Sequence, residues 1–156
     1  MLDQTSQNLI DILRAELTGS DEADISGLSD QELAAIYRLA KAHNLSSMAG
    51  DFMANHGVMN KVIFRDMAYA QTNVEKQEKT LAEITKALSE AGIPFLPLKG
   101  IVMRRLYPKP WMRLSGDIDI LIKEADKKRI YDIFTNQLQY RLESTLDEDH
   151  FITKEH

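Results

Sequence analysis

From about Val58 to Glu90 the sequence contains neither proline nor glycine, and its apolar residues recur with the approximate period of an α-helix. Gly92 follows and is the natural stop, because glycine accepts the left-handed conformation in which many helices end. This pattern predicts one long helix, or two helices divided near Thr72–Asn73.

The residues before this stretch also favour helices. An apolar stripe at helical spacing runs from Leu2 to Leu17. The range Ser29–Glu32 is a capping box, in which the serine hydroxyl accepts from a free backbone N–H and the glutamate reaches back to the cap. The range 46–55 predicts one more short helix. We therefore expect residues 1–90 to form a helical N-terminal region.

The pattern changes after Gly92, since all four prolines lie between Pro94 and Pro110. Short apolar runs predict strands at 93–98, 117–122, 140–144 and 151–152, and helical periodicity predicts helices at 101–106 and 124–137. We expect residues 91–156 to form an α/β core. The predicted fold is α+β, with the N-terminal helical region packed on a small mixed β-sheet.

The balance of charges and the absence of cysteine exclude several classes of protein. With no cysteine in 156 residues, disulfide frameworks, thiol nucleophiles and cysteine-bound metals are ruled out. The formal net charge of −5 disfavours nucleic acid as the main partner, because proteins that bind it usually carry a basic face. No apolar run approaches the roughly 20 residues of a membrane helix, and the acidic start is unlike a secretory signal. We expect a cytoplasmic protein without membrane association.

Two acidic residues, Asp117 and Asp119, stand one residue apart on a predicted strand. Side chains at this spacing share a face, with Cα atoms about 6.5–7 Å apart. A hard divalent cation relieves the repulsion between two such carboxylates, and Mg²⁺ is typically held by one or two carboxylates together with phosphate oxygens. A solvated strand edge explains the same pair without any metal.

Other residues close to this pair suit the binding of phosphate. Arg113 can hydrogen-bond a phosphate bidentately, and Ser115–Gly116 allows a ligand to approach the backbone. Lys99–Gly100 ends one predicted strand and opens a helix, where backbone N–H groups and a lysine together attract an anion. Taken singly, Lys99–Gly100 is an ordinary turn and Arg113 an ordinary surface charge, so the prediction rests on their conjunction.

The stretch from Gly92 to about Arg129, and especially LKGIVMRRLYPKPWMRLSGDIDILI, resembles the poorly characterised nucleotidyltransferase branch of the polymerase-beta-like nucleotidyltransferase superfamily. The resemblance implies a sheet of nucleotidyltransferase type and transfer of a nucleoside monophosphate from a nucleoside triphosphate to an acceptor hydroxyl, on a small molecule or a protein. It implies catalytic and metal-binding roles for Asp117 and Asp119, with Mg²⁺ as the cofactor and Mn²⁺ as its alternative. It implies nucleotide binding by Lys99, Gly100, Arg113, Ser115 and Gly116.

The family pattern also asks for a third carboxylate on a later strand. The candidates are Asp147, Glu148, Asp149 and Glu155, none of which lies in an apolar strand pattern. We therefore expect an incomplete sheet and a fragment of a longer protein, with weak activity or none. Two alternatives stay open, which are a non-catalytic module that binds nucleotide or metal and a helical protein-interaction module.

Overall fold

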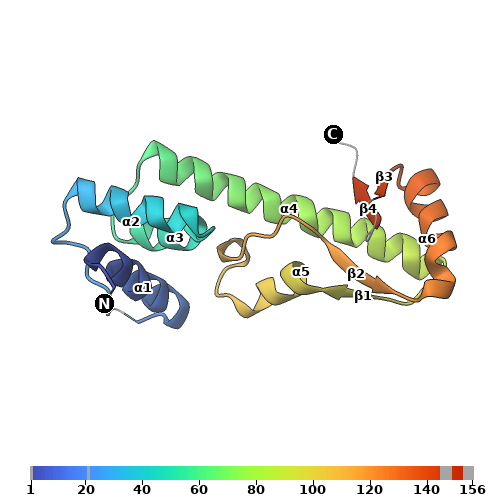
Figure 1. Ribbon diagram of the computed structural model, residues 1–156, viewed down its shortest axis with the longest axis horizontal. Helices are drawn as coiled ribbons and strands as arrows, with labels where there is room; N and C mark the ends of the chain where they lie inside the picture. Colours follow the sequence, from blue (N-terminus) through green and yellow to red (C-terminus); the bar gives the residue numbers. More distant parts are fainter. Residues whose placement is uncertain (1, 21, 145–148, 153–156) are drawn as a thin grey trace.

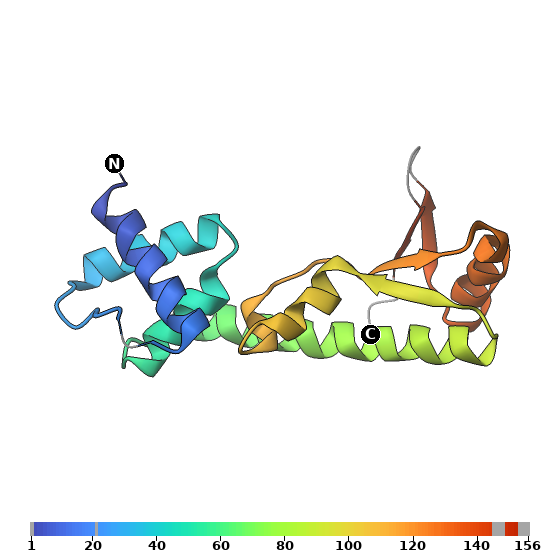
Figure 2. The ribbon, with the colours of Figure 1, turned by 90° about the horizontal axis from the view of Figure 1, so that it is seen from below.

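The structure is a computed structural model that describes residues 2–20, 22–144 and 149–152. Three helices lie at one end of an elongated molecule, a long fourth helix runs along its length, and the strands lie at the other end (Figures 1 and 2). The helices are α1 (Gln4–Thr18), α2 (Asp30–Ala42), α3 (Ser46–Asn55), α4 (Lys61–Glu90), α5 (Lys99–Met103) and α6 (Lys127–Asp132). The strands are β1 (Phe95–Leu98), β2 (Asp119–Ile122), β3 (Arg141–Ser144) and β4 (Asp149–Ile152). Four short turns of helix join them, namely η1 (Arg104–Leu106), η2 (Pro110–Met112), η3 (Glu124–Asp126) and η4 (Ile133–Gln137).

Helices α1, α2 and α4 begin at side-chain caps, whereas α3 begins after Leu45 without one. The predicted capping box at α2 is confirmed, because Ser29 and Glu32 satisfy each other's backbone N–H groups. Asn60 caps α4 by accepting from the backbone N–H groups of Val62 and Ile63 at 2.9 and 3.1 Å. A first core cluster joins α1, α2, α3 and the start of α4, and its most buried members are Ile12, Ile36, Ala40, Ala49, Met53 and Ile63.

Helix α4 is continuous from Lys61 to Glu90, without a break at Thr72–Asn73. It ends in a Schellman motif, in which Gly92 has a φ of 65° and the Ile93 N–H donates to the Leu88 carbonyl at 2.9 Å. The predicted stop at Gly92 is therefore confirmed. Because Ile63 belongs to the first core cluster and Leu88 to a second, this one helix joins the two.

The second core cluster lies between the end of α4 and the segments that follow it. It combines Ile84, Ala87 and Leu88 of α4 with Ile93, Ile130, Ile133, Phe134 and Tyr140. Phe134 packs edge-on against Phe151 of β4, with ring centroids 4.9 Å apart. The predicted helix at 124–137 is built from a 3₁₀ turn, the short α6 and a π-helical turn.

The four strands form two antiparallel pairs rather than one mixed sheet. Strand β1 pairs with β2 so that Phe95 faces Ile122 and Leu98 faces Asp119, and β3 pairs with β4. The α+β class and the small, incomplete sheet are as predicted. Within the described part of the chain, no helix is both long and apolar enough to cross a membrane.

Candidate functional site

The first feature of the site is the junction between β1 and α5. Strand β1 ends at Leu98 and α5 begins at Lys99, whose backbone has a left-handed φ of 47°. Such a conformation is uncommon and costs a non-glycine residue about 1–3 kcal/mol, and residues of this kind cluster at functional sites. Since Leu98 lies opposite Asp119, the turn brings the Lys99 Nζ within 3.5 Å of the Asp119 Oδ1.

The Lys99–Asp119 pair is open to solvent. The side chain of Lys99 is 74% exposed and that of Asp119 is 38% exposed. Exposed pairs of this kind typically contribute about 0–1 kcal/mol to stability. Both charges therefore stay available to a ligand.

Gly100 lies directly against Ser115, so the two predicted phosphate-binding pairs meet in space. A Cβ added at Gly100 would lie 2.2 Å from the Ser115 Oγ and 2.7 Å from its Cβ, a separation that real Cβ atoms do not show. The Ser115 hydroxyl donates to the backbone carbonyl of Asp117 at 3.0 Å. Any side chain at position 100 would push apart the loop that leads to Asp117 and Asp119.

Helix α4 holds this loop through two amide side chains one turn apart. The Nδ2 of Asn73 and the Nε2 of Gln77 both donate to the Ser115 carbonyl, at 3.1 and 2.8 Å. The Oε1 of Gln77 in turn accepts from an Nη2 N–H of Arg104. Sequence reasoning missed these contacts, and the only local signal was two amides four residues apart on a predicted helix.

Two arginines, Arg104 and Arg113, lie close to each other near this loop. Arg104 is 2% exposed, and burial lowers the pKa of its guanidinium; Glu78 opposes this shift and the nearby charge of Arg113 adds to it. The Nε and Nη1 of Arg104 and the Nε of Arg113 are buried and have no hydrogen-bond partner among the residues described. Because an arginine stays charged in a protein, this region carries unbalanced positive charge.

The position of Asp117 corrects the predicted strand at 117–122. Strand β2 begins at Asp119, and Asp117 precedes it as an exposed residue. The reason lies in the partner strand, since β1 turns into α5 at Lys99 and offers no backbone for Asp117 to pair with. The pleat of a strand therefore does not set the relative placement of the two aspartates.

The remaining predicted residues are less constrained. Gly116 is exposed, and open space surrounds its Cα where a Cβ would be. Of the candidates for a third carboxylate, Asp147, Glu148 and Glu155 lie outside the described residues, as does the side chain of Asp149. In the part of the chain that is described, no group of three or more His, Cys, Asp or Glu residues could hold a metal ion.

A second cluster of charges, which sequence reasoning missed, lies where η2 meets α1 and α3. Asp51 of α3 accepts from the Lys109 Nζ and from the Trp111 Nε1 (3.3 Å), and the Glu16 Oε1 lies 3.9 Å from the same lysine nitrogen. The side chains of Asp51 and Glu16 are only 6% and 10% exposed. An acidic residue inside the apolar run Met48–Met53 was the sequence signal that could have revealed it.

These two carboxyl groups lie close enough to shift each other's pKa. Burial, together with the hydrogen bond and charge of Asp51, raises the pKa of Glu16 to about 7. Burial acts to raise the pKa of Asp51 as well, but its hydrogen bonds with Lys109, Glu16 and Trp111 lower it overall. Glu16 therefore binds its proton more tightly than an ordinary glutamate does, and the cluster fastens the segment before Arg113 to the N-terminal helices.

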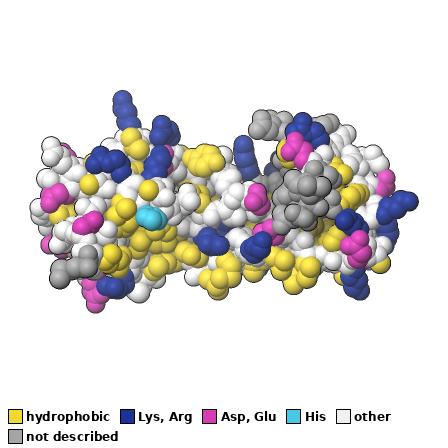
Figure 3. All heavy atoms as spheres, in the orientation of Figure 1, with side chains coloured by type: hydrophobic (Ala, Val, Ile, Leu, Met, Phe, Trp, Pro, Cys, Tyr) yellow, Lys and Arg dark blue, Asp and Glu magenta, His cyan; other side chains and the backbone are white. Residues whose placement is uncertain are grey.

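On the face seen in Figure 3, lysine and arginine do not gather into a single patch. Figure 3 shows Lys and Arg side chains scattered among acidic and apolar ones over one face of the molecule.

Comparison with known protein families gives a match. The family described as "Uncharacterised nucleotidyltransferase" matches residues 29–156, which include α2 to β4 and the whole candidate site. No curated protein and no solved structure matches the chain.

Proposed function

The chain belongs to the uncharacterised nucleotidyltransferase family, and on that premise we propose that the site around Lys99 and Asp119 transfers a nucleoside monophosphate from a nucleoside triphosphate to an acceptor hydroxyl in a Mg²⁺-dependent reaction. Family membership supports nucleotidyl transfer in general. The metal, the residues and the acceptor, a small molecule or a protein, belong to the proposal.

The observation that carries the proposal is the convergence of Lys99, Gly100, Ser115 and Asp119 from two segments of the chain. The Lys99 Nζ and the Asp119 carboxylate are 3.5 Å apart at the end of a hairpin, and Gly100 lies against Ser115. A cation and a carboxylate that are both exposed and only weakly paired suit a ligand carrying phosphate and a cation.

Asp117 and Asp119 would supply carboxylate oxygens to a Mg²⁺ ion, with Mn²⁺ as the alternative. The Asp119 carboxylate accepts one long contact from Lys99, and the side chain of Asp117 is exposed two residues before it. Mg²⁺ is commonly held by one or two carboxylates, with substrate phosphates and water completing its shell. When bound, the ion would neutralise phosphate charge and polarise the phosphoryl group.

The residues of the chain then have separate tasks. Asp117 and Asp119 hold the ion, and Lys99 and Arg113 place positive charge on the phosphates, where negative charge develops during transfer. Gly116 lets the phosphates approach the backbone. The acceptor hydroxyl gives up its proton to water, its oxygen forms a bond to the α-phosphorus while the bond to the bridging oxygen breaks, and pyrophosphate leaves with that electron pair.

The test uses the 156-residue chain with each α-labelled nucleoside triphosphate and either Mg²⁺ or Mn²⁺. Metal-dependent binding is expected, with weak release of pyrophosphate or weak labelling of an acceptor, and Asp117→Asn and Asp119→Asn should abolish both. Asp11→Asn is a matched control, because Asp11 has a similarly exposed side chain (35%) in another surface ion pair.

Three outcomes of this test separate the alternatives. Metal-dependent nucleotide binding without any transfer would favour a non-catalytic nucleotide-binding module over an enzyme. Binding that neither metal nor Asp119→Asn changes would overturn the assignment of the site. No effect of nucleotide and metal on the melting temperature would favour the helical interaction module.

A further inference from the structure

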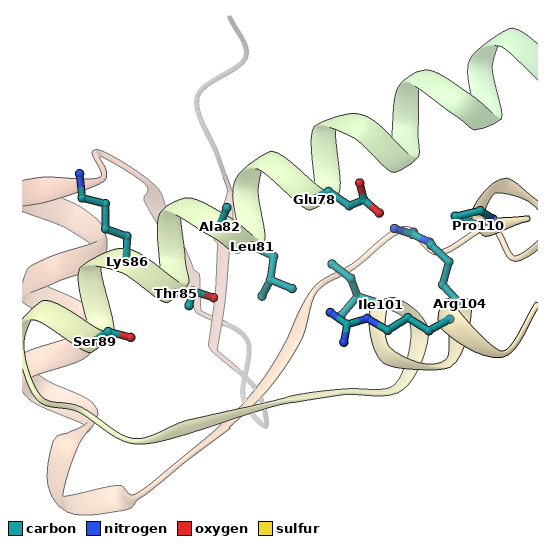
Figure 4. A pocket seen from close by; sticks show the side chains of 10 residues that line it. Glu78, Leu81, Ala82, Thr85, Lys86, Ser89, Ile101, Arg104 and Pro110 are labelled. Carbon is teal, nitrogen blue, oxygen red and sulfur yellow. The ribbon is translucent and has the colours of Figure 1, made fainter.

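A groove lies between α4 and the segment formed by α5 and η1, on the side of α5 that faces the long helix. It has a volume of about 470 Å³, which is within the range of small-molecule sites in proteins. Leu81 on α4 and Ile101 on α5 point toward one another across it (Figure 4). The middle of the groove is therefore apolar.

The charged side chains lie at one end of the groove. Arg104 and Glu78 line it there, and Figure 4 shows the Glu78 carboxylate turned toward the arginine end. Arg105, the next residue in the chain, also lines the groove. Lys86 also lines the groove, but its ammonium group points away in the same view. Two guanidinium groups against one carboxylate leave this end with a net positive charge.

Arg104 is the second, independent observation. It is 2% exposed, Gln77 is the one hydrogen-bond partner of its side chain among the described residues, and its Nε and Nη1 are unpaired. Leaving donors of a buried cation unsatisfied is costly, so such groups commonly serve a ligand or an ion. The exposed Arg105 next to it offers a planar fork of donors that matches an oxyanion.

We propose that this groove binds a small organic oxyanion, whose apolar body lies on Leu81 and Ile101 and whose charged oxygens face Arg104 and Arg105. Phosphate and carboxylate groups share this chemistry. None of Lys99, Asp117 and Asp119 lines the groove, so the proposal does not rest on the nucleotidyl-transfer site.

Phenyl phosphate, benzoate and benzyl alcohol are suitable probes, because they keep one ring and change only the polar group. Binding is measured by isothermal titration calorimetry and by NMR shifts of the groove residues, in EDTA so that no divalent ion contributes. The two anions should bind and compete with one another, and benzyl alcohol should bind at least tenfold more weakly. Whichever anion binds more tightly identifies the preferred oxyanion.

Two surface substitutions test the assignment without disturbing the core. Arg105→Gln should weaken anion binding about tenfold, since it removes one charge-assisted contact. Thr85→Glu places a negative charge on the groove face of α4 and should abolish the binding. Lys79→Gln and Thr72→Glu are the matched controls, because both are exposed on α4 and line no part of the groove.

Equal binding of benzyl alcohol and the anions would overturn the proposal, as would anion binding that Arg105→Gln and Thr85→Glu leave unchanged. Asp119→Asn should leave anion binding intact. If that substitution abolishes it, the anions occupy the nucleotide site and the groove is not their binding site. Loss of nucleotidyl transfer in Asp119→Asn with retained anion binding separates the two sites.

Discussion

The molecule contains two aspartate–lysine pairs that are chemically alike and differ in their surroundings. Asp51 and Lys109 meet between the N-terminal helices and η2, with side chains 6% and 35% exposed. Asp119 and Lys99 meet at the end of the β1–β2 hairpin, with side chains 38% and 74% exposed. Asp51 also accepts from Trp111 and Asn55, whereas Asp119 has one long contact.

The comparison teaches how the same two residue types serve structure in one place and binding in another. A buried carboxylate has to be satisfied by its neighbours, and once satisfied it has no oxygen to offer. An exposed carboxylate in a weak pair keeps its lone pairs accessible to a cation. We therefore expect substitutions at Asp51 to change stability, and substitutions at Asp119 to change binding.

The largest effect is expected from breaking the buried pair. Asp51→Ala leaves Lys109 half-buried without its main partner and should lower the free energy of unfolding by about 3–5 kcal/mol. Urea denaturation measures this, and Asp11→Ala in an exposed pair, expected to cost less than about 1 kcal/mol, is the control. A loss of under about 1 kcal/mol for Asp51→Ala would show that the two pairs do not differ as proposed.

The next prediction concerns the two cores that α4 joins. Met53→Ala in the first cluster and Leu88→Ala in the second each remove a fully buried side chain and should cost about 2–5 kcal/mol. Because α4 contributes to both clusters, each variant should shift one cooperative transition followed by circular dichroism. Two separate transitions would instead show that the ends of the molecule unfold independently.

Gly100 offers a test of the contact that assembles the candidate site. Gly100→Ala forces a Cβ onto Ser115 and should cost about 1–3 kcal/mol through overpacking. The double variant Gly100→Ala with Ser115→Gly should recover most of that loss, because the crowded atoms are gone. Thermal melting of the single and double variants checks this, and an absence of rescue would contradict the contact.

The raised pKa of Glu16 in the buried cluster predicts a dependence of stability on pH. The folded protein holds the pKa of Glu16 at about 7, above its ordinary value of 4.5, so the folded state binds more protons than the unfolded chain between these values. The contribution of Glu16 to the free energy of unfolding is fully present below about pH 4.5 and is lost as the pH rises through about 7. The lowered pKa of Asp51 acts in a separate window, since its contribution is lost as the pH falls below its ordinary value of 3.8.

Glu16→Gln imitates the protonated carboxyl and should flatten the decline in melting temperature between pH 5 and pH 8. Glu75→Gln on the exposed face of α4 is the control and should keep the decline. If the melting temperature of Glu16→Gln declines as steeply as that of the unmodified chain, Glu16 is not the group whose proton stabilises the fold.

The smallest effect on stability is expected at the exposed pair. Asp119→Asn and Lys99→Gln should each change the free energy of unfolding by less than about 1 kcal/mol. The same variants should lose metal-dependent nucleotide binding, which fluorescence titration with a labelled nucleotide would measure. A large loss of stability in either variant would assign this pair to the structure rather than to binding.

Features set by neighbouring residues could be predicted from the sequence. The capping box at Ser29, the long helix and its stop at Gly92 depend on local chemistry, and all three are confirmed. The start of β2 at Asp119 could not be predicted, because it depends on where the partner strand turns away. Asn73 and Gln77 lie 42 and 38 residues before Ser115 in the sequence. No sequence signal shows that residues so far away will hold a loop, so these contacts were missed.

Features that depend on burial were also beyond sequence reasoning. Nothing in the sequence sets Arg104 and Lys109 apart from other charged residues. Only the packing of η1 and η2 against the helices buries the first and pairs the second with Asp51. Gly100 and Ser115 are fifteen residues apart in the sequence and lie against each other in the structure. The sequence indicated Lys99–Gly100 and Ser115–Gly116 as separate motifs but could not show that they are in contact.

The unbroken course of α4 also restricts how the length of this chain can vary. Each residue in an α-helix adds about 1.5 Å and turns the next one by about 100°. Ile63, Gln77 and Leu88 contact three different parts of the molecule from this one helix. Inserting or deleting one residue between Ile63 and Gln77 would rotate Gln77 and Leu88 away from the parts of the molecule they contact. The loop before α2 has no helical period, so a change of length there causes no such rotation. Natural changes in length should therefore accumulate in the loops and avoid α4.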